Sequence, residues 1–324
     1  MLTGFVRQSD GTIDTLDTTE AVTAASARKG VELWIDLEEP TDDEVHAVGA
    51  AFRLDAEALE DCLSGEQRPR IDEFEDYIFL VLYGALRPDG NSEFDPRKLA
   101  AFLGPNAVIT VHRQPIRSLS NVRDRCRRNA RNLLDRGADF VLYSIIDAIV
   151  DNYILAADEY EQRLEDLEDD SLRLDVDESI LARSGELRRE LLELRRLATS
   201  QRELLTPVAK GEYEHVSEVL EQRFAHVEDH LMHATELIDA LRDRLNAVHD
   251  NYHNALAHRT NAIMKTLTLF ATIMLPLTLV AGIYGMNLPL WPPPDHPASF
   301  WGVLGGMLAI TGTVLYYFRR KYWL

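Results

Sequence analysis

The sequence predicts an α+β membrane protein, with an N-terminal α/β domain, long helices after it and two transmembrane helices at the C-terminus. Three observations predict this class. Up to about residue 113, short apolar runs alternate with amphipathic segments. After Pro115 no proline occurs until Pro207, and Leu, Glu, Arg and Ala recur at helical spacing. Two apolar stretches near the C-terminus are each close to the roughly 20 residues that cross a bilayer as a helix.

Residues 1–115 are expected to form the α/β domain. A helix is predicted from Thr41, because three acidic residues, Asp42, Asp43 and Glu44, occupy its first turn. Pro88-Asp89-Gly90-Asn91 is typical of a hairpin turn. The clearest strands are rich in β-branched and aromatic residues, and they cover Val31–Leu37, Tyr77–Tyr83, Leu99–Leu103 and Val108–Val111.

Residues 116–207 are expected to form antiparallel helices. One helix is predicted over Asp139–Leu172, ending in a run of acidic residues, and a second over Val176–Leu205 returns antiparallel to it. Gly185 inside the second helix costs about 1 kcal/mol. The acidic turn is either solvent-exposed charge or a patch that attracts cations, and the sequence leaves both open.

Residues 208–265 are expected to form a long stalk helix. No proline interrupts Val208–Leu275, so one helix of about 65 to 70 residues, about 100 Å long, should run from the stalk into the membrane. Its partner is either the preceding helices of the same chain or other copies of the chain. The apolar residues alternate in steps of four and three, a heptad pattern that we call the seam: Leu220, Phe224, Val227, Leu231, Ala234, Ile238, Leu241, Leu245, Val248, Tyr252 and Ala255.

Transmembrane helices are predicted over 266–285 and 300–318, and a buried hairpin in a soluble core is the alternative. A core helix of a soluble domain keeps a polar face, whereas neither apolar stretch carries an ionisable residue. Lys265 precedes the first and basic residues follow the second, whereas the loop 286–299 holds no Lys or Arg. Positive-inside orientation therefore places the loop outside and both termini, with the tail 319–324, in the cytoplasm, as in a multi-pass protein of the cell (inner) membrane.

The charge is concentrated in the N-terminal part. All but one of the 54 acidic residues precede Lys265, whereas four of the 34 basic residues lie at or after it, so residues 1–264 carry a formal charge of about −23. This charge argues against nucleic acid or anionic lipid as a ligand and raises the local concentration of cations. A solvated acidic surface that maintains solubility is the alternative.

Several classes of protein are excluded by what the sequence lacks. Cys62 and Cys126 are far apart, which argues against a disulfide framework or a cysteine zinc site and fits a reducing cytoplasm. The first residues do not form a signal peptide, so we expect insertion to depend on the C-terminal hairpin. No phosphate-binding glycine loop, nucleophile elbow or paired-histidine motif with its glutamate is present, so an enzyme is not expected.

One face of the first apolar stretch mixes amide, hydroxyl and apolar side chains at steps of three or four residues. These are Asn261, Met264, Thr268, Thr272 and Leu275. Such a face suits a narrow pore with polar positions and hydrophobic constrictions. Since two spans cannot enclose an aqueous path, a transporting chain would have to oligomerise. A packing face in a membrane dimer has the same spacing and stays open as an alternative.

Motifs along the whole chain resemble those of the CorA family of magnesium and cobalt transporters. They are Gln67-Arg68-Pro69, Glu75-Asp76-Tyr77, Leu142–Ala148 with Val150-Asp151, Thr260–Thr268, Ala271-Thr272-Ile273, Pro276-Leu277-Thr278, Ala281–Asn287 and Arg319–Leu324. Gly285-Met286-Asn287 lies at the end of the first predicted span, where chance occurrence is improbable. The resemblance implies a funnel-shaped homopentamer that moves divalent cations passively, driven by the membrane potential.

The resemblance also implies roles for individual residues. Gly285, Met286 and Asn287 would form the selectivity filter, where five Asn287 amides bind the waters of a cation, which suits the reluctant dehydration of Mg²⁺. The remaining implied roles are polar pore positions at Asn261, Thr268 and Thr272, a hydrophobic gate at Met264, Leu267 and Leu275, and an acidic inner mouth at Asp250.

The chain departs from the family pattern in two places. The outer loop lacks the family's Met-Pro-Glu, and Asp295 is its only acidic residue. His226 stands where the family places an Asp of an intersubunit regulatory magnesium site, with Asp229 one turn on. His226, Asp229, His230 and His233, and further on His249 and His253, offer ligands for zinc, cobalt or nickel. Solvated helix-face histidines are the alternative.

The sequence therefore predicts a passive channel or transporter for Mg²⁺, also passing Co²⁺, regulated by cytoplasmic divalent ions. A zinc transporter like the related ZntB proteins is one alternative, and a membrane-anchored metal-sensing scaffold without transport is another. The expected partners are copies of the chain, membrane lipid and divalent cations, and no nucleic acid. No cofactor is expected beyond the transported or regulatory ion, which is Mg²⁺, with Co²⁺ or Zn²⁺ as further candidates.

Overall fold

The structure is a computed structural model that describes residues 1–64, 68–86, 95–171, 179–286 and 297–320. The chain forms two compact units. The first comprises Met1–Asp170 and Asp177–Val248, and the second comprises Ser171–Val176 and His249–Leu324.

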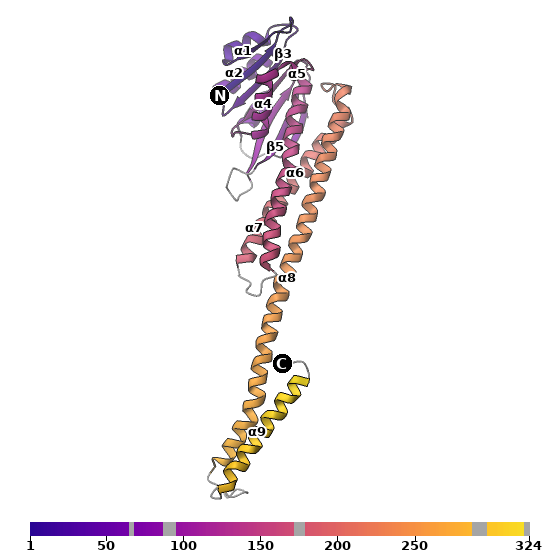
Figure 1. Ribbon diagram of the computed structural model, residues 1–324. Coiled ribbons are helices and arrows are strands. Elements are labelled where there is room, and N and C mark those ends of the chain that lie inside the picture. The colour runs from indigo at the N-terminus through magenta and orange to yellow at the C-terminus, as the bar shows by residue number, and fades with distance from the viewer. Residues whose placement is uncertain (65–67, 87–94, 172–178, 287–296, 321–324) are drawn as a thin grey trace. The chain divides into compact units, whose positions relative to one another are not determined.

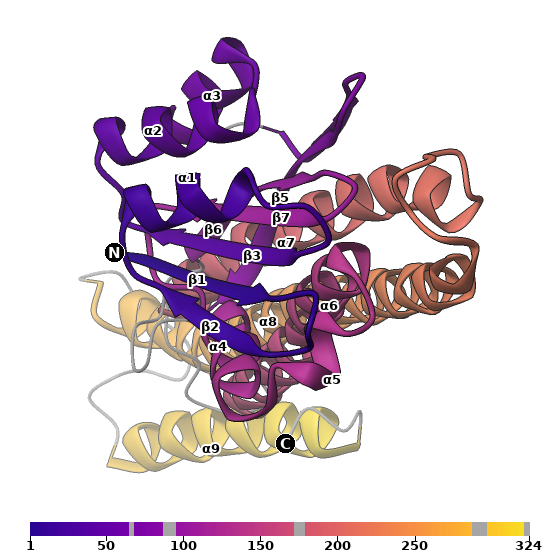
Figure 2. The same ribbon diagram turned by 90° about the horizontal axis from the view of Figure 1, so that it is seen from above.

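A seven-stranded sheet forms the centre of the first unit, in the order β2-β1-β3-β7-β6-β5-β4. Neighbouring strands are antiparallel except for the parallel pair β3 and β7. Helices α1 and α2 lie over one face of the sheet, and α4 and α5 lie over the other (Figure 2). The strands are β1 (Leu2–Arg7), β2 (Ile13–Leu16), β3 (Glu32–Glu38), β4 (Arg70–Glu73), β5 (Ile78–Leu86), β6 (Asp95–Leu103) and β7 (Ala107–His112).

The four predicted strands are confirmed as β3, β5, β6 and β7, each within a few residues of its predicted bounds. The turn predicted at Pro88–Asn91 lies outside the described residues, but β5 and β6 pair as an antiparallel hairpin around it. Strands β2 and β4 were not predicted, since each has only four residues at an edge of the sheet. In β1, Gly4 weakens the strand pattern; a Cβ there would lie 2.9 Å from Leu16 Cβ, so the glycine permits close pairing with β2.

The helix predicted from Thr41 is α2 (Asp42–Phe52). Thr41 is its N-cap, and its hydroxyl accepts a hydrogen bond from the Glu44 backbone N–H while the Glu44 carboxylate accepts one from the Thr41 N–H. This reciprocal arrangement satisfies two backbone donors that the first turn leaves unpaired. The remaining short helices are α1 (Thr19–Ser26), α3 (Ala56–Leu63), α4 (Arg117–Asn129) and α5 (Arg131–Leu134).

Three long helices, α6 (Ala138–Ser171), α7 (Ser179–Ala209) and the N-terminal part of α8 (Glu218–Tyr284), form a bundle in the first unit (Figure 1). Ion pairs fix their directions. Arg183 with Asp170 and Arg163 with Glu190 show that α6 and α7 are antiparallel. Arg195 with Asp239 joins α7 to α8. His230 with Asp151 and Arg244 with Glu168 show that α8 runs parallel to α6. Antiparallel pairing of the two helices in 116–207 is thus confirmed.

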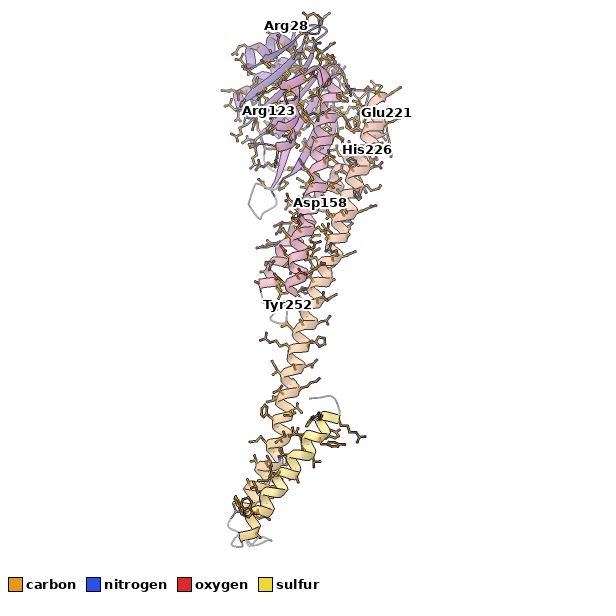
Figure 3. All side chains as sticks on the ribbon, in the orientation of Figure 1. Arg28, Arg123, Asp158, Glu221, His226 and Tyr252 are labelled. Atoms are coloured by element: carbon orange, nitrogen blue, oxygen red, sulfur yellow. The ribbon has the colours of Figure 1, made fainter. Side chains whose placement is uncertain are left out.

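The seam on α8 packs within its own chain. Its residues from Leu220 to Val248 are at most 5% exposed in the first unit, and Tyr252 (Figure 3) is also buried. Phe224 contacts the ring of Tyr143 on α6 edge to face. The seam therefore packs against helices of its own chain, which is one of the two partners that the sequence allowed. Contacts with other copies of the chain would have to use other faces of α8.

The boundary between α7 and α8 differs from the predicted one. α7 continues through Pro207 to Ala209, and the stalk helix begins at Glu218 instead of residue 208. Gly211 ends the helical path because it adopts a positive φ of 71°, which a glycine tolerates without strain. Pro207 lies in the last turn of α7, which ends two residues after it, so few helical residues follow the proline.

Among the residues that the structure describes, three helices are long and apolar enough to cross a membrane: α6, α8 and α9 (Pro297–Arg320). In α6, 56% of the most apolar 18-residue segment is buried inside the protein. In the corresponding segments of α8 and α9, the buried fractions are 0% and 6%. The apolar side chains of α6 thus belong to the bundle core. Those of α8 and α9 face outward, unlike the side chains of a hairpin buried in a soluble core. Pro276 lies inside the apolar part of α8.

Candidate functional site

A polar stripe follows one face of α8 through the second unit. At about 100° per residue, Asp250, Asn254, Asn261, Thr268 and Thr272 fall within about 40° of one direction. All are exposed except Thr268, which is half-buried. The face that the sequence predicted is thus largely exposed, and Asp250 extends it by about three turns.

Apolar side chains interrupt this stripe at two levels. Met264 is 53% exposed and Leu275 is 72% exposed, and both point along the same face as the polar residues. Leu267 is 60% exposed but lies about 60° to 80° from Met264 and Leu275 around the helix, and at least about 100° from the polar residues. The structure therefore brings Met264 and Leu275 into line with the stripe and places Leu267 on its flank.

The threonine hydroxyls of the stripe are oriented by the helix itself. Thr268 donates to the carbonyl oxygen of Met264 and Thr272 donates to that of Thr268, both at 2.7 Å. Since each hydroxyl proton is used inside the helix, the oxygen lone pairs remain available to the outside. The stripe therefore presents hydrogen-bond acceptors, which suit the water protons of a hydrated cation.

The tripeptide predicted as the selectivity filter begins where α8 ends. Gly285 N–H donates to Ala281 O at 2.9 Å and Met286 N–H to Ile283 O at 3.2 Å. A Cβ on Gly285 would lie 3.1 Å from that Ala281 oxygen, so glycine fits this last turn best. Met286 is exposed. Asn287 and Asp295 lie outside the described residues.

A second cluster lies between α6 and α8 in the first unit. Asp147, Asp151 and His230 offer ligand atoms within 4.8 Å of one another. His230 Nδ1 is 3.4 Å from Asp151 Oδ1, is buried and makes no hydrogen bond of ordinary geometry. Burial first, and then the Asp151 carboxylate, raise the pKa of Asp147. A cation bound here would reduce the repulsion between the two carboxylates and would give His230 Nδ1 a partner.

This cluster overlaps only in part with the predicted regulatory ligands. His230 belongs to it, and the ring of His226 (Figure 3) lies 4.3 Å from that of His230. Asp229 and His233 are exposed and are not part of it. Asp147 and Asp151 are not predicted as ligands from the sequence, although they lie in a motif that carries the family resemblance. Only the parallel packing of α6 on α8 brings them to His230.

A third cluster, Asp36, Glu38 and His112, lies at the ends of β3 and β7. Arg123 on α4 already occupies its centre, with Nη1 at 2.9 Å from Asp36 Oδ2 and 2.6 Å from Glu38 Oε2. His112 Nε2 is 3.2 Å from Asp36 Oδ1, and Thr110 donates to the same oxygen. Because the guanidinium already pairs with both carboxylates, we interpret the cluster as a structural ion network.

His112 should make the stability of this network depend on pH. Burial alone would lower the pKa of His112, but the hydrogen bond and charge of Asp36 outweigh it and raise the pKa. Protonated His112 therefore stabilises the folded state fully below its ordinary pKa of 6.5, and this contribution is lost as pH rises through the raised value.

Hydrogen exchange of the β3 and β7 amides measures this effect. After correction for intrinsic exchange, the opening free energy should fall above neutral pH by at most about 1.4 kcal/mol per pH unit, the slope for one proton. The His112→Gln variant should lack this fall. An equal pH dependence in both proteins would contradict the assignment to His112.

Comparison with known proteins identifies relatives over most of the chain. The family model described as CorA-like Mg²⁺ transporter protein matches residues 30–320. The cobalt/magnesium transport protein CorA of Thermotoga maritima is 32% identical over 286 residues, which cover 87% of this chain and 80% of that protein. The zinc transport protein ZntB of Pectobacterium carotovorum is 25% identical over 275 residues, covering 83% of this chain and 81% of that protein.

A solved structure shares the fold. The complete structure of the CorA magnesium transporter from Methanocaldococcus jannaschii matches with a TM-score of 0.86, covering 99% of this chain and 98% of that chain. The sequence identity over this match is 22%, so the likeness concerns the fold, with its α/β domain and long helices.

Proposed function

The chain belongs to the family of CorA-like Mg²⁺ transporter proteins, and from this premise we propose that it conducts Mg²⁺, and also Co²⁺, passively across the cell membrane. The observation that carries the proposal is the exposed stripe on α8, in which hydrogen-bond acceptors alternate with apolar side chains up to Gly285-Met286. Membership in a transporter family also supports the expectation that the chain is not an enzyme.

Conduction requires several copies of the chain. One stripe cannot shield an aqueous path from lipid, so we propose a homopentamer with the stripe of each α8 facing a common axis. Burial of the seam within each chain supports this arrangement, because it leaves the stripe free for the axis. In this assembly α8 and α9 would be the two membrane spans, with both termini in the cytoplasm and the connecting loop outside.

The proposed path has polar and apolar levels. Asp250 would form an acidic ring at the inner mouth, where it concentrates cations. Asn261, Thr268 and Thr272 would bind the waters of a hydrated ion, and Met264 and Leu275 would form constrictions that close by losing water. Leu267, on the flank of the stripe, would pack between neighbouring α8 helices. Gly285, Met286 and Asn287 would select the ion through its water shell, which suits Mg²⁺.

We assign regulation by cytoplasmic divalent ions to the cluster of Asp147, Asp151 and His230, with His226 beside it. Two carboxylates and an imidazole fit a divalent cation, with nitrogen favouring Co²⁺ or Zn²⁺ and oxygen accepting Mg²⁺. The raised pKa of Asp147 supports this assignment, since burial and then the neighbouring Asp151 carboxylate disfavour its charged form, which a bound cation would stabilise.

Substitution of Asp147 tests the regulatory site. Asp147→Asn should raise the melting temperature of the ion-free protein, because it removes repulsion from Asp151, and should abolish most of the stabilisation that Co²⁺ gives. At a Co²⁺ concentration 100 times the dissociation constant, that stabilisation is about 2.7 kcal/mol in the parent protein.

Asp158→Asn is the matched control for this substitution. Asp158 (Figure 3) is exposed on the same face of α6, three turns further on. Its substitution should change neither the melting temperature of the ion-free protein nor the stabilisation by Co²⁺. Equal Co²⁺ stabilisation of the Asp147→Asn protein and the parent would remove the regulatory role from this cluster.

A zinc transporter is the second candidate function. The pair of His226 and His230 beside two carboxylates favours it, because imidazole is a preferred ligand of Zn²⁺. The similarity to ZntB also supports it.

Flux into proteoliposomes decides between these functions. Purified protein should admit Mg²⁺ and Co²⁺ when the membrane potential is inside-negative, with or without a proton gradient, and a substitution-inert mimic of the hexahydrated ion should block entry. Zinc flux that needs the proton gradient and excludes Mg²⁺ would favour the zinc transporter. Absence of any flux from correctly assembled protein would favour a scaffold.

A further inference from the structure

A second pair of histidines lies on α8, in the second unit, outside the clusters described above. His249 and His253 are about one helical turn apart, and both side chains are exposed. Their Nε2 atoms are 3.1 Å apart, and the ring planes meet at 76° with centroids 4.6 Å apart. This contact is a hydrogen bond between the two ring nitrogens, which therefore lie together beside the helix instead of in separate regions of solvent.

The separation of these nitrogens suits chelation of a single metal ion. Imidazole nitrogen binds zinc at about 2.0–2.1 Å, so two nitrogens on one ion lie about 2.9 Å apart at a right angle and about 3.4 Å apart at the tetrahedral angle. The observed 3.1 Å falls between these values. Among the described residues, no third His, Cys, Asp or Glu joins the pair, so water would complete the coordination.

We propose that His249 and His253 form a binding site for a late first-row transition-metal ion, Zn²⁺, Co²⁺ or Ni²⁺, that excludes Mg²⁺. Neutral imidazole binds these ions strongly, with affinity rising through the series toward copper. Magnesium prefers oxygen ligands and dehydrates reluctantly, so two nitrogens offer it little. The site would let the chain respond to transition metals separately from Mg²⁺. It does not depend on the proposed transport function.

The pair lies beside the polar stripe and not in it. Around α8, His249 and His253 lie about 100° from the direction shared by Asp250, Asn254 and Asn261. A metal ion chelated there would add positive charge next to the exposed Asp250 carboxylate while leaving the acceptors of the stripe unobstructed. Substitution of either histidine should therefore leave the stripe intact.

Cobalt titration of the full-length protein in detergent tests the proposal, with the visible absorption of Co²⁺ as the signal. The His226→Ala/His230→Ala background removes nitrogen ligands of the other cluster. In this background, His249→Ala or His253→Ala should weaken Co²⁺ binding at least about tenfold, because a single imidazole loses the chelate effect. Replacing both histidines should reduce the number of Co²⁺ ions bound through nitrogen by one per chain. Millimolar Mg²⁺ should not displace the ion.

His258→Ala is the matched control, because His258 is an exposed histidine on the same helix with no histidine one turn away. It should leave Co²⁺ binding unchanged, and circular dichroism should show equal helix content in all variants. Unchanged Co²⁺ spectra and affinity after loss of both His249 and His253 would overturn the proposal and reduce their contact to a hydrogen bond. Displacement of Co²⁺ by equimolar Mg²⁺ would overturn the claimed selectivity. Both readouts are binding measurements, so the outcome of the flux experiment does not affect them.

Discussion

Replacing Asn287 with alanine is expected to reduce Mg²⁺ flux at least about 100-fold. In the proposed pentamer the substitution removes five amides that hydrogen-bond the waters of the entering ion. Each net hydrogen bond contributes about 1 kcal/mol, and every 1.4 kcal/mol changes occupancy tenfold. Because Asn287 follows the end of α8, the change should leave helix formation unaffected. The measurement is potential-driven Mg²⁺ entry into proteoliposomes with equal amounts of assembled protein.

Asn251→Ala provides the matched control for this substitution. Asn251 is an exposed asparagine on α8 that points about 80° away from the stripe, so its loss should leave Mg²⁺ flux unchanged. Normal Mg²⁺ flux through an assembled Asn287→Ala protein would remove the selectivity role from this residue. Equal losses in both variants would indicate a general effect on reconstitution.

Replacing Arg123 with alanine is expected to destabilise the α/β domain by about 3–5 kcal/mol, the range for breaking a buried ion pair by removal of one partner. The side chain of Asp36 is fully buried, and Arg123 is only 12% exposed. Without the guanidinium, the charges of Asp36 and Glu38 would keep only His112 as a cationic partner. The opening free energy of the β3 and β7 amides, obtained from hydrogen exchange, measures the loss.

The control for this prediction lies on the same helix. Arg127 is 47% exposed and lies 3.8 Å from Asp124, so Arg127→Ala should change the opening free energy by at most about 0.5 kcal/mol. Adding Asp36→Asn to Arg123→Ala should recover part of the lost stability, because it removes the unpaired charge. Equal effects of the two arginine substitutions would show that the network contributes no specific stability.

The seam on α8 shows how far the sequence predicts the fold. The heptad steps from Leu220 to Tyr252 predict which residues are buried, and each of them is. Periodicity does not identify the partner, because any apolar stripe of matching length would satisfy it. The partner was settled by contacts between distant segments, such as Phe224 with Tyr143. The same limit applies to the boundary between α7 and α8. The helix continues through Pro207, where the sequence predicted its end, and stops just before Gly211.

The candidate sites differ in how visible they are in the sequence. The stripe on α8 is predictable because its members are separated by fixed steps along one helix. The Asp147, Asp151 and His230 cluster is not, because it joins two helices about 80 residues apart in the chain. The network of Asp36, Glu38, His112 and Arg123 depends on the register in which Glu38 pairs with His112. In the sequence, the only sign of this network is that charged residues stand at the ends of two apolar strands.

Pro276 gives the apolar part of α8 a point of reduced bending stiffness. Proline has no backbone N–H, so the carbonyl of Thr272 loses its usual helical partner, and the ring disfavours a straight path. The last two turns of α8, up to Tyr284, can therefore tilt about this hinge at lower cost than in an uninterrupted helix. The hinge separates Leu275 from Gly285, so in the proposed pore a tilt at Pro276 would reorient Gly285 and Met286 while Leu275 keeps its position.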